Sequence, residues 1–291
     1  MEVRAKKALG QHFLTDQSIA KGIVAALSAN SPVRDVLEVG PGMGVLSQYL
    51  LERPDIDLKM VEIDSESVAY LLTHFPAAHG RLLEADFLKL DLGRVFGGPF
   101  RVIGNFPYNI SSQIFFKILD HKDDVPEVVC MIQKEVAQRI AEGPGSKVYG
   151  ILSVLLQTWY DIEYVMSVGS GAFAPPPKVQ SAVIRLTRNS RATLGCDEKL
   201  FRQVVKAAFG QRRKTLRNAL RPLAAAKAAR EGRADLPGTP AGASAPVPAG
   251  TPAPAHSVPS SLAALLSDPV FDLRAERLSV EDFVRLTNLL A

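Results

Sequence analysis

The sequence contains few of the residues that build disulfide or metal frameworks. Cysteine occurs only twice in 291 residues, at Cys130 and Cys196, and there is no Cys-x-x-Cys pair. This usage fits a reducing compartment and argues against a fold held by disulfides. The five histidines form no pairs at the spacing of metal ligands. We therefore expect neither a structural disulfide nor a metal site.

Long apolar runs are also missing. No stretch is long enough to span a bilayer, and residues 1–7 show no signal-peptide pattern. From these absences we expect a soluble, cytoplasmic protein without membrane partners. A hydrophobic content of 47% over 291 residues is enough for a substantial core, and one large plus one small domain is the natural division. We expect a monomer, because no feature demands a larger assembly.

A glycine-rich turn follows the first apolar strand pattern. The strand pattern covers residues 36–39, the turn is Gly40-Pro41-Gly42-Met43-Gly44, and a helical pattern follows at 45–51. Glycines at the end of a first strand let the backbone approach a ligand closely, as a nucleotide-like cofactor requires. Gly40 and Gly42 are therefore candidate cofactor-binding residues.

Acidic residues follow the next two strand patterns. Glu62 ends the pattern at 58–61, about 20 residues after the glycines, where a carboxylate that binds ribose hydroxyls is expected. Asp86 follows the strand-like residues 81–83, where it could accept a hydrogen bond from an adenine amino group. Helix capping or solvation is the alternative role for either residue alone.

A dinucleotide site would use the same turn and the same acidic residue. However, its fingerprint has a third glycine where this sequence has Val45, which weakens the case for a pyrophosphate. We favour S-adenosylmethionine as the cofactor, because it has no phosphate and needs contacts to ribose, adenine and methionine instead.

The segment Asn105-Phe106-Pro107-Tyr108 is suited to holding a flat aromatic amine. It follows an apolar strand pattern at 101–104. Asn105 offers a carbonyl oxygen, Pro107 a carbonyl without a competing N–H, and Tyr108 a ring face for stacking. These are the groups that an adenine N6 methyltransferase needs, because that amine is a poor nucleophile. The alternative is a strand end and proline turn with both aromatic rings in the core.

Phe173 precedes a run of prolines at 175–177. Prolines stiffen a loop, so this ring could stack on a flipped adenine opposite Tyr108. The alternative is a rigid connector into the strand pattern at 179–186 with Phe173 buried. The residues alone leave both possibilities open.

Basic residues are concentrated late in the chain. Between Arg185 and Arg233 there are 14 Lys and Arg residues against 3 Asp and Glu residues, whereas the net charge of the whole chain is +4. Spacings of four residues place several of them on one helical face. Such a stripe suits RNA phosphates, although a solvated face is the common alternative. The candidate RNA-binding residues are Arg202, Lys206, Arg212, Arg213, Lys214, Arg217 and Arg221.

The order of the patterns predicts the fold class. Strands and helices alternate up to about residue 190, which implies an α/β protein with a mainly parallel, doubly wound sheet. From Cys196 onward the pattern is helical. We therefore place a catalytic domain at 1–190 and a small, all-helical RNA-binding domain at 196–291. The Ala- and Pro-rich segment 234–260 should form a flexible loop within the second domain.

These motifs together resemble the small-subunit (16S) ribosomal RNA adenine N6-dimethyltransferases of the KsgA type. Besides the segments above, the resemblance covers Lys6 to Leu14, Met131 to Arg139, Phe173 to Ser181 and Phe209 to Leu216, in order along most of the chain. It implies a class I (Rossmann-like) S-adenosylmethionine-dependent methyltransferase sheet, closed by an antiparallel strand pair. It also implies dimethylation of two adjacent adenosines in a hairpin loop near the 3′ end of small-subunit ribosomal RNA, in an assembling subunit. The implied cofactor contacts are His12, Leu14, Gly40, Glu62, Asp86 and Asn105.

The sequence departs from the commonest family pattern at two positions. Phe106 stands where Leu is commonest, and His12 where Asn is commonest. The first change exchanges apolar residues and leaves the roles of its neighbours intact. For His12, a side-chain contact to a ligand and a capping or packing role are equally compatible with the sequence.

Three other functions remain as alternatives. A large-subunit ribosomal RNA methyltransferase of the antibiotic-resistance type would share the glycine turn and the adenine clamp, which we define as residues 105–108. A nicotinamide oxidoreductase is disfavoured by Val45 and by the lack of an evident acid for hydride transfer. A non-catalytic ribosome assembly factor could have retained the fold, although an intact clamp argues against it.

Overall fold

The computed structural model describes residue 6 and residues 9–234 and 262–291. The segment 234–260, which we expect to be flexible, lies outside these residues apart from Ala234. The chain divides into two compact units, one comprising residues up to Glu142 with Leu152–Ala192, and the other Gly143–Ile151 with Thr193–Ala291. The short segment 143–151, which we had placed in the catalytic domain, thus belongs to the helical unit.

The first unit is built on a seven-stranded sheet with the order β4-β3-β2-β5-β6-β9-β7. Strands β2 to β6 are parallel, while β9 runs antiparallel to both β6 and β7. This confirms the predicted Rossmann-like sheet with its closing antiparallel pair. The strands are β2 (Asp35–Val39), β3 (Asp57–Glu62), β4 (Leu82–Glu84), β5 (Arg101–Asn105), β6 (Glu127–Gln133), β7 (Tyr160–Val168) and β9 (Ser181–Arg188).

A second, two-stranded sheet was not predicted. In it, β1 (Phe13–Leu14) pairs antiparallel with β8 (Phe173–Ala174), and Leu14 lies opposite Phe173. This pairing brings the N-terminal segment beside the start of the proline-rich loop, although the two are about 160 residues apart in the sequence.

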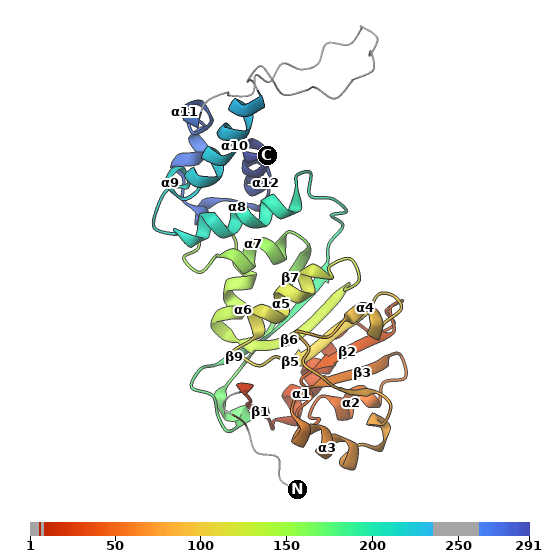
Figure 1. The fold of residues 1–291 in the computed structure, drawn as a ribbon. Helices are drawn as coiled ribbons and strands as arrows, with labels where there is room; N and C mark the ends of the chain where they lie inside the picture. Colours follow the sequence, from red (N-terminus) through yellow and green to blue (C-terminus); the bar gives the residue numbers. More distant parts are fainter. Residues whose placement is uncertain (1–5, 7–8, 235–261) are drawn as a thin grey trace, which may run out of the picture. The chain divides into compact units, whose positions relative to one another are not determined.

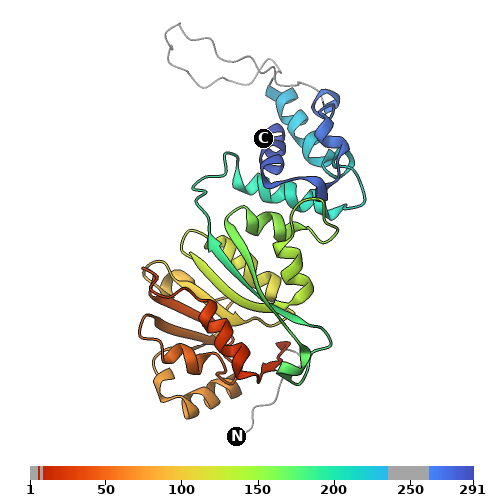
Figure 2. The ribbon, with the colours of Figure 1, turned by 180° about the vertical axis from the view of Figure 1, so that it is seen from behind.

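Helices cover both faces of the large sheet. Figures 1 and 2, seen from opposite sides, show α5 in front of the sheet in one view and α1 in front of it in the other. Asp16 caps α1 by accepting hydrogen bonds from the N–H groups of Ser18 and Ile19. The helices are α1 (Gln17–Ala26), α2 (Ser47–Leu51), α3 (Ser65–His74), α4 (Leu92–Val95), α5 (Ser111–Asp120), α6 (Lys134–Ala141) and α7 (Ile151–Gln157), with short 3₁₀ turns at Pro76–Ala78 and Ser170–Ala172.

Helix α5 begins without a side-chain cap. Its N-cap is Ile110, which makes no side-chain hydrogen bond. The hydroxyl of Ser111 instead donates to the Tyr108 carbonyl at 3.3 Å. That bond stabilises the turn that carries Tyr108.

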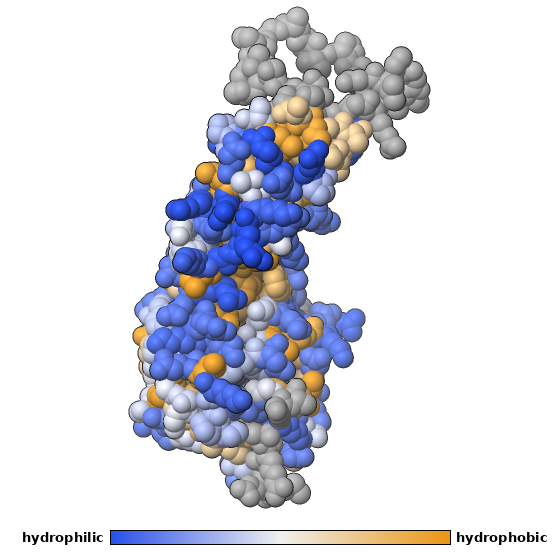
Figure 3. All heavy atoms as spheres, turned by 90° about the vertical axis from the view of Figure 1, so that its left-hand side faces the viewer, coloured by the Kyte–Doolittle hydropathy of each residue, from blue (hydrophilic) through white to orange (hydrophobic). Residues whose placement is uncertain are grey.

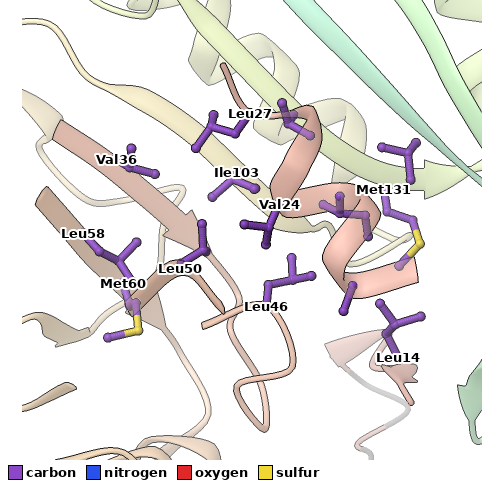
Figure 4. Packing of buried hydrophobic residues seen from close by; sticks show 14 of the residues in the cluster. Leu14, Val24, Leu27, Val36, Leu46, Leu50, Leu58, Met60, Ile103 and Met131 are labelled. Atoms are coloured by element: carbon purple, nitrogen blue, oxygen red, sulfur yellow. The ribbon is translucent and has the colours of Figure 1, made fainter. Parts of the chain in front are cut away.

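A hydrophobic core fixes the central strands. In Figure 4, Val24 of α1, its C-cap Leu27, and Leu46 and Leu50 around α2 lie against Ile103 of β5. Ile103 and Leu50 are fully buried, and each such side chain stabilises the fold by about 1.5–3 kcal/mol relative to an exposed position. This packing gives the strand ends a rigid support.

The strand order reverses between β2 and β5. The chain moves from β2 outward through β3 to β4, and later from β5 outward through β6. Ligands of open α/β sheets bind at the carboxyl ends of the strands at such a reversal. The two strands approach closely here, because a Cβ added to Gly104 would lie 2.5 Å from the Val39 carbonyl oxygen.

The second unit is entirely helical in its described part. Its core contains Phe201, Val204, Val205, Ala208, Leu216 and Leu220. Ser279 and Asp282 form a capping box, because they exchange side-chain and backbone hydrogen bonds. The helices are α8 (Glu198–Gly210), α9 (Leu216–Ala219), α10 (Arg221–Ala234), α11 (Leu262–Leu265) and α12 (Val280–Leu290), with 3₁₀ turns at Pro269–Asp272 and Ala275–Arg277.

Local contacts explain why segment 143–151 joins this unit. The Gly145 N–H donates to the Glu276 carbonyl at 2.6 Å, and Arg212 donates to the Tyr149 carbonyl at 2.9 Å. The Tyr149 ring also meets Phe209 edge-on. Among the described residues of the whole chain, no helix is long and apolar enough to cross a membrane.

Candidate active site

A cavity of about 270 Å³ opens at the carboxyl ends of β2, β3 and β5. It lies at the strand reversal, where the sheet topology predicts a ligand site. Every predicted cofactor-binding residue lines it, as do three of the four predicted catalytic residues. The predicted residues on its wall are His12, Leu14, Gly40, Gly42, Glu62, Asp86, Asn105, Pro107 and Tyr108.

Glu62 is held in place by the glycine turn and by its own strand end. One carboxylate oxygen accepts from the Gly42 N–H at 3.0 Å, and the other accepts from the N–H groups of Ile63 and Asp64 at 2.8 and 2.9 Å. Gly42 has a φ of +56°, a conformation that favours glycine. Burial raises the pKa of Glu62, while the three backbone donors oppose the shift. The carboxylate is therefore oriented before any ligand binds.

Glu38 is a polar residue of the cavity that the sequence analysis missed. It lies within β2, is 1% exposed, and accepts from the Ser47 hydroxyl at 2.7 Å through one oxygen. The other oxygen, Oε1, is buried without a hydrogen-bond partner among the described residues. Burial raises the pKa of Glu38 to about 8, with Ser47 opposing and Glu62 adding to the shift. An acidic residue inside an otherwise apolar strand was the signal that could have identified it.

Asp86 makes contacts within its own turn and also lines the cavity. One of its oxygens accepts from the Leu88 N–H at 2.9 Å, and the other lies 3.6 Å from the Lys89 ammonium. Its side chain is 28% exposed. Both roles considered for this residue, local capping and an acceptor at the cavity, are therefore compatible with its position.

Asn105 ends β5 with its amide oriented by the N-terminal segment. Its Nδ2 donates to the backbone carbonyl of His12 at 3.1 Å. No residue in the described part of the chain donates to Asn105 Oδ1, which remains an acceptor. The Pro107 carbonyl accepts from the Ile110 N–H at 3.2 Å and keeps its second lone pair. Phe106 is buried and packs edge-on against Phe115, so it supports the clamp from below the cavity.

Tyr108 is fixed at its hydroxyl and covered on its ring. The hydroxyl shares a hydrogen bond with Ser181 of β9. Burial raises the pKa of Tyr108, with the Ser181 hydrogen bond opposing. The His12 ring stacks on the Tyr108 ring with centroids 5.4 Å apart and planes inclined by 29°.

Phe173 does not line the cavity. It is 4% exposed and belongs to the hydrophobic core, where its strand pairs with Leu14. The structure thus places the ring in the buried position that we considered as the alternative. Stacking on a base opposite Tyr108 stays a prediction, and it requires the ring to leave this position.

The N-terminal segment crosses the cavity as a strap, which we define as Lys6 and residues 9–12. Residues 9–12 line the cavity. Lys6 anchors the strap through ion pairs of 2.5 Å to Asp64 and 3.0 Å to Glu66. Although burial opposes the shift, hydrogen bonds from Lys6, Ser67 and Gln11 lower the pKa of Asp64.

The predicted basic stripe separates into two groups. Arg212 donates to the carbonyls of Lys147 and Tyr149, and Arg217 pairs with Asp272 at 2.7 Å and donates to the Leu266 carbonyl at 2.7 Å. These two therefore hold the helical unit together.

The other basic side chains lie on the surface of the helical unit. Arg213, Lys214 and Arg221 are exposed, and their side chains form no hydrogen bond or ion pair with any described residue. Arg202 on α8 is partly exposed, and Lys206 on the same helix is exposed. Hydrophilic side chains gather on the face of this unit that Figure 3 shows.

The cavity matches a cationic nucleoside rather than a metal. Glu62 suits ribose hydroxyls, Asp86 suits an exocyclic amine, and the unpartnered oxygen of Glu38 suits an ammonium group. Within the described ranges, no group of three or more His, Cys, Asp and Glu residues could hold a metal ion. The acceptors present thus fit the ribose, adenine and α-amino groups of S-adenosylmethionine.

Comparison with known proteins adds a family and a fold. A family model described as ribosomal RNA adenine dimethylase matches residues 2–232. The protein named ribosomal RNA small subunit methyltransferase A from Parabacteroides distasonis is 53% identical over 285 residues, which cover 98% of this chain and 93% of the relative. The protein of the same name from Cytophaga hutchinsonii is 48% identical over 290 residues, which cover 100% of this chain and 98% of the relative.

Two solved structures share the fold over nearly the whole chain. A dimethyladenosine transferase from Plasmodium falciparum aligns with a TM-score of 0.72 and 23% identity, covering 94% of this chain and 96% of that one. The 23S rRNA methyltransferase ErmE aligns with a TM-score of 0.59 and 23% identity, covering 96% of this chain and 99% of that one. Their shared architecture is that of the α/β sheet with an appended helical part.

Proposed function

The chain belongs to the ribosomal RNA adenine dimethylase family, and we propose that it dimethylates N6 of two adjacent adenosines in the 3′-terminal hairpin loop of small-subunit ribosomal RNA. Its methyl donor is S-adenosylmethionine. We further propose that it acts as a monomer in the cytoplasm, on an assembling small subunit. The curated relatives, which carry a small-subunit name, favour this RNA over that of the large subunit.

The observation that carries the catalytic proposal is the oriented amide of Asn105. Its nitrogen is engaged by the His12 carbonyl, so Oδ1 faces the cavity as an acceptor. Oδ1 and the free lone pair of the Pro107 carbonyl would accept hydrogen bonds from an adenine amine. Such bonds draw N6 towards tetrahedral geometry and free the lone pair that attack requires. Tyr108 would stack on the base, and we propose the same for Phe173 after it leaves the core.

S-adenosylmethionine supplies an activated methyl group on its sulfonium when bound. The chain would orient the reacting groups: Gly40, Gly42, Glu62 and Asp86 would hold the nucleoside end, and Glu38 would bind the α-ammonium group. Proximity of the clamp to this site then supplies much of the rate. No strong general base is required, because the amine proton becomes acidic only after methyl transfer and passes to water.

RNA affinity in this proposal comes from the exposed basic residues of the helical unit. Arg213, Lys214 and Arg221, with Arg202 and Lys206 on α8, would contact phosphates without reading sequence. Arg212 and Arg217 contribute indirectly, because their side chains already bind acceptors within the unit.

The test is a methylation assay with labelled S-adenosylmethionine and three substrates: small subunits without adenine dimethylation, dimethylated small subunits, and large subunits. We expect N6,N6-dimethyladenosine after nuclease digestion of the first substrate only. Label on the large subunit alone would favour the antibiotic-resistance type of enzyme. No label on any substrate, with folded protein that still binds small subunits, would instead favour a non-catalytic assembly factor.

A further inference from the structure

His12 contacts the clamp at two residues and the proline-rich loop at one. Its ring lies on the Tyr108 ring, with centroids 5.4 Å apart. Its Nδ1 lies 3.0 Å from the carbonyl oxygen of Pro175, in the proline-rich loop that follows Phe173. Its backbone carbonyl accepts from Asn105. The imidazole therefore bridges the clamp and the proline-rich loop.

The proposed reaction also places the target base against Tyr108. A flipped adenine held by Asn105 must lie against Tyr108, and a second stacking ring would come from the Phe173 side. In the structure, a flat aromatic side chain already makes the Tyr108 contact, while Phe173 remains in the core. An imidazole and a purine cannot occupy one ring face together.

We propose that the His12 side chain occupies the target-base site and must swing out before an adenine can bind. The inference rests on the proposed function, because it assumes that the base stacks on the face of Tyr108 that the imidazole covers. It assigns to the side chain a role that is separate from the cofactor contact expected for this position.

The local contacts allow the ring to move without disturbing the strap. The side chain is held by one stacking contact and one hydrogen bond, and it is not part of the buried core. Leu14, two residues later, is 3% exposed and paired in the β1–β8 sheet, so the backbone stays fixed. Displacing the ring lowers the apparent affinity for every adenine substrate by the same factor, on the order of tenfold for one stack and one hydrogen bond. Only RNA with many contacts elsewhere then reaches high occupancy.

The test compares wild type with His12→Asn, His12→Ala and His12→Phe on a minimal RNA hairpin. Asn and Ala remove the ring, so we expect kcat/KM for the hairpin to rise about tenfold while the Kd for S-adenosylmethionine changes little. His12→Phe keeps a stacking ring and should not show this gain. An unchanged or lower kcat/KM in both ring-free variants would overturn the inference, as would loss of cofactor binding in both.

An NMR measurement on the wild type separates displacement from a purely structural role. The ring protons of His12, assigned by their absence in His12→Asn, should lose the ring-current shift from Tyr108 when RNA is added, and keep it with S-adenosylmethionine alone. A shift that persists in the RNA complex would overturn the inference. If the wild type methylates undermethylated small subunits but the His12 variants fail these tests, only the inference fails. If the wild type methylates no substrate, the proposed function fails as well.

Discussion

The side-chain amide of Asn105 donates a hydrogen bond to the backbone carbonyl of His12 over 3.1 Å. This one contact joins the clamp to the strap that crosses the cofactor cavity. It fixes which end of the amide faces the cavity, because the nitrogen is engaged and the oxygen is left as the acceptor. Binding of the cofactor beneath the strap and orientation of the target amine are thereby linked.

The anchor of the strap should affect cofactor affinity. We expect Lys6→Ala to raise the Kd for S-adenosylmethionine about threefold, because the ion pair with the buried Asp64 holds residues 9–12 over the cavity. Glu66→Ala is the matched control, since it removes only the outer, 47% exposed partner of Lys6. Titration calorimetry measures both. Equal effects of the two changes would contradict a specific role for the Lys6–Asp64 pair.

Glu38 should make the stability of the cofactor-free protein depend on pH. Burial raises its pKa from an ordinary value of 4.5 to about 8. A carboxyl group whose folded-state pKa is raised contributes stability that is present below its unfolded pKa and lost as pH rises through the folded value. We therefore expect the free energy of unfolding to fall between about pH 5 and 8 in wild type, relative to Glu38→Gln.

Denaturant titrations across this pH range check the prediction. Parallel stability curves for wild type and Glu38→Gln would show that the buried carboxyl group does not titrate there. Saturating S-adenosylmethionine should reduce the difference, because its ammonium group would pair with the ionised carboxylate.

The junction of β2 and β5 should not tolerate a methyl group. Gly104→Ala would place a Cβ 2.5 Å from the Val39 carbonyl, and we expect it to destabilise the protein by about 1–3 kcal/mol. Gly97→Ala makes the same chemical change where no atom lies within 4 Å. Chemical denaturation measures both variants. A stable Gly104→Ala protein would mean that the two strand ends are not so tightly packed.

Substitution of the exposed basic residues should weaken RNA binding, whereas substitution of a basic residue that binds acceptors within the helical unit should lower stability. We expect the double change Arg213→Ala and Lys214→Ala to weaken RNA binding about tenfold and to reduce the slope of log K against log salt by about 2, with the melting temperature unchanged. Arg217→Ala should instead lower stability by about 1 kcal/mol, because it loses Asp272 and the Leu266 carbonyl. Filter binding at several salt concentrations and thermal unfolding separate the two outcomes. Equal losses of RNA affinity in the double variant and in Arg217→Ala would contradict this division of roles.

Sequence patterns predicted the sheet and most of the cavity because both depend on local features. Apolar strands ending in Gly40, Glu62 and Asn105 place these residues at one edge of a parallel sheet, whatever the detailed packing. Contacts between segments that lie far apart in the sequence could not be predicted from local patterns. The stacking of His12 on Tyr108 joins positions 96 residues apart, and the engagement of Arg212 depends on segment 143–151 folding against the helical unit.

The surroundings of buried groups could not be predicted from the sequence either. Glu38 stands in an apolar strand pattern, but only the structure shows that one of its oxygens lacks a partner. Phe173 was open to two interpretations, because a proline-rich loop can present a ring or bury it. Its pairing with Leu14, which decides its present position, belongs to the β1–β8 sheet, and no local pattern predicted that sheet.

The most direct test of the clamp is single-turnover methyl transfer by Asn105→Ala, with S-adenosylmethionine and undermethylated small subunits both saturating. Loss of the Oδ1 acceptor should lower the rate about 100-fold, while the affinity for the subunit stays within about threefold of wild type. A rate equal to that of wild type would contradict the account, because the oriented amide would then have no part in activating the amine.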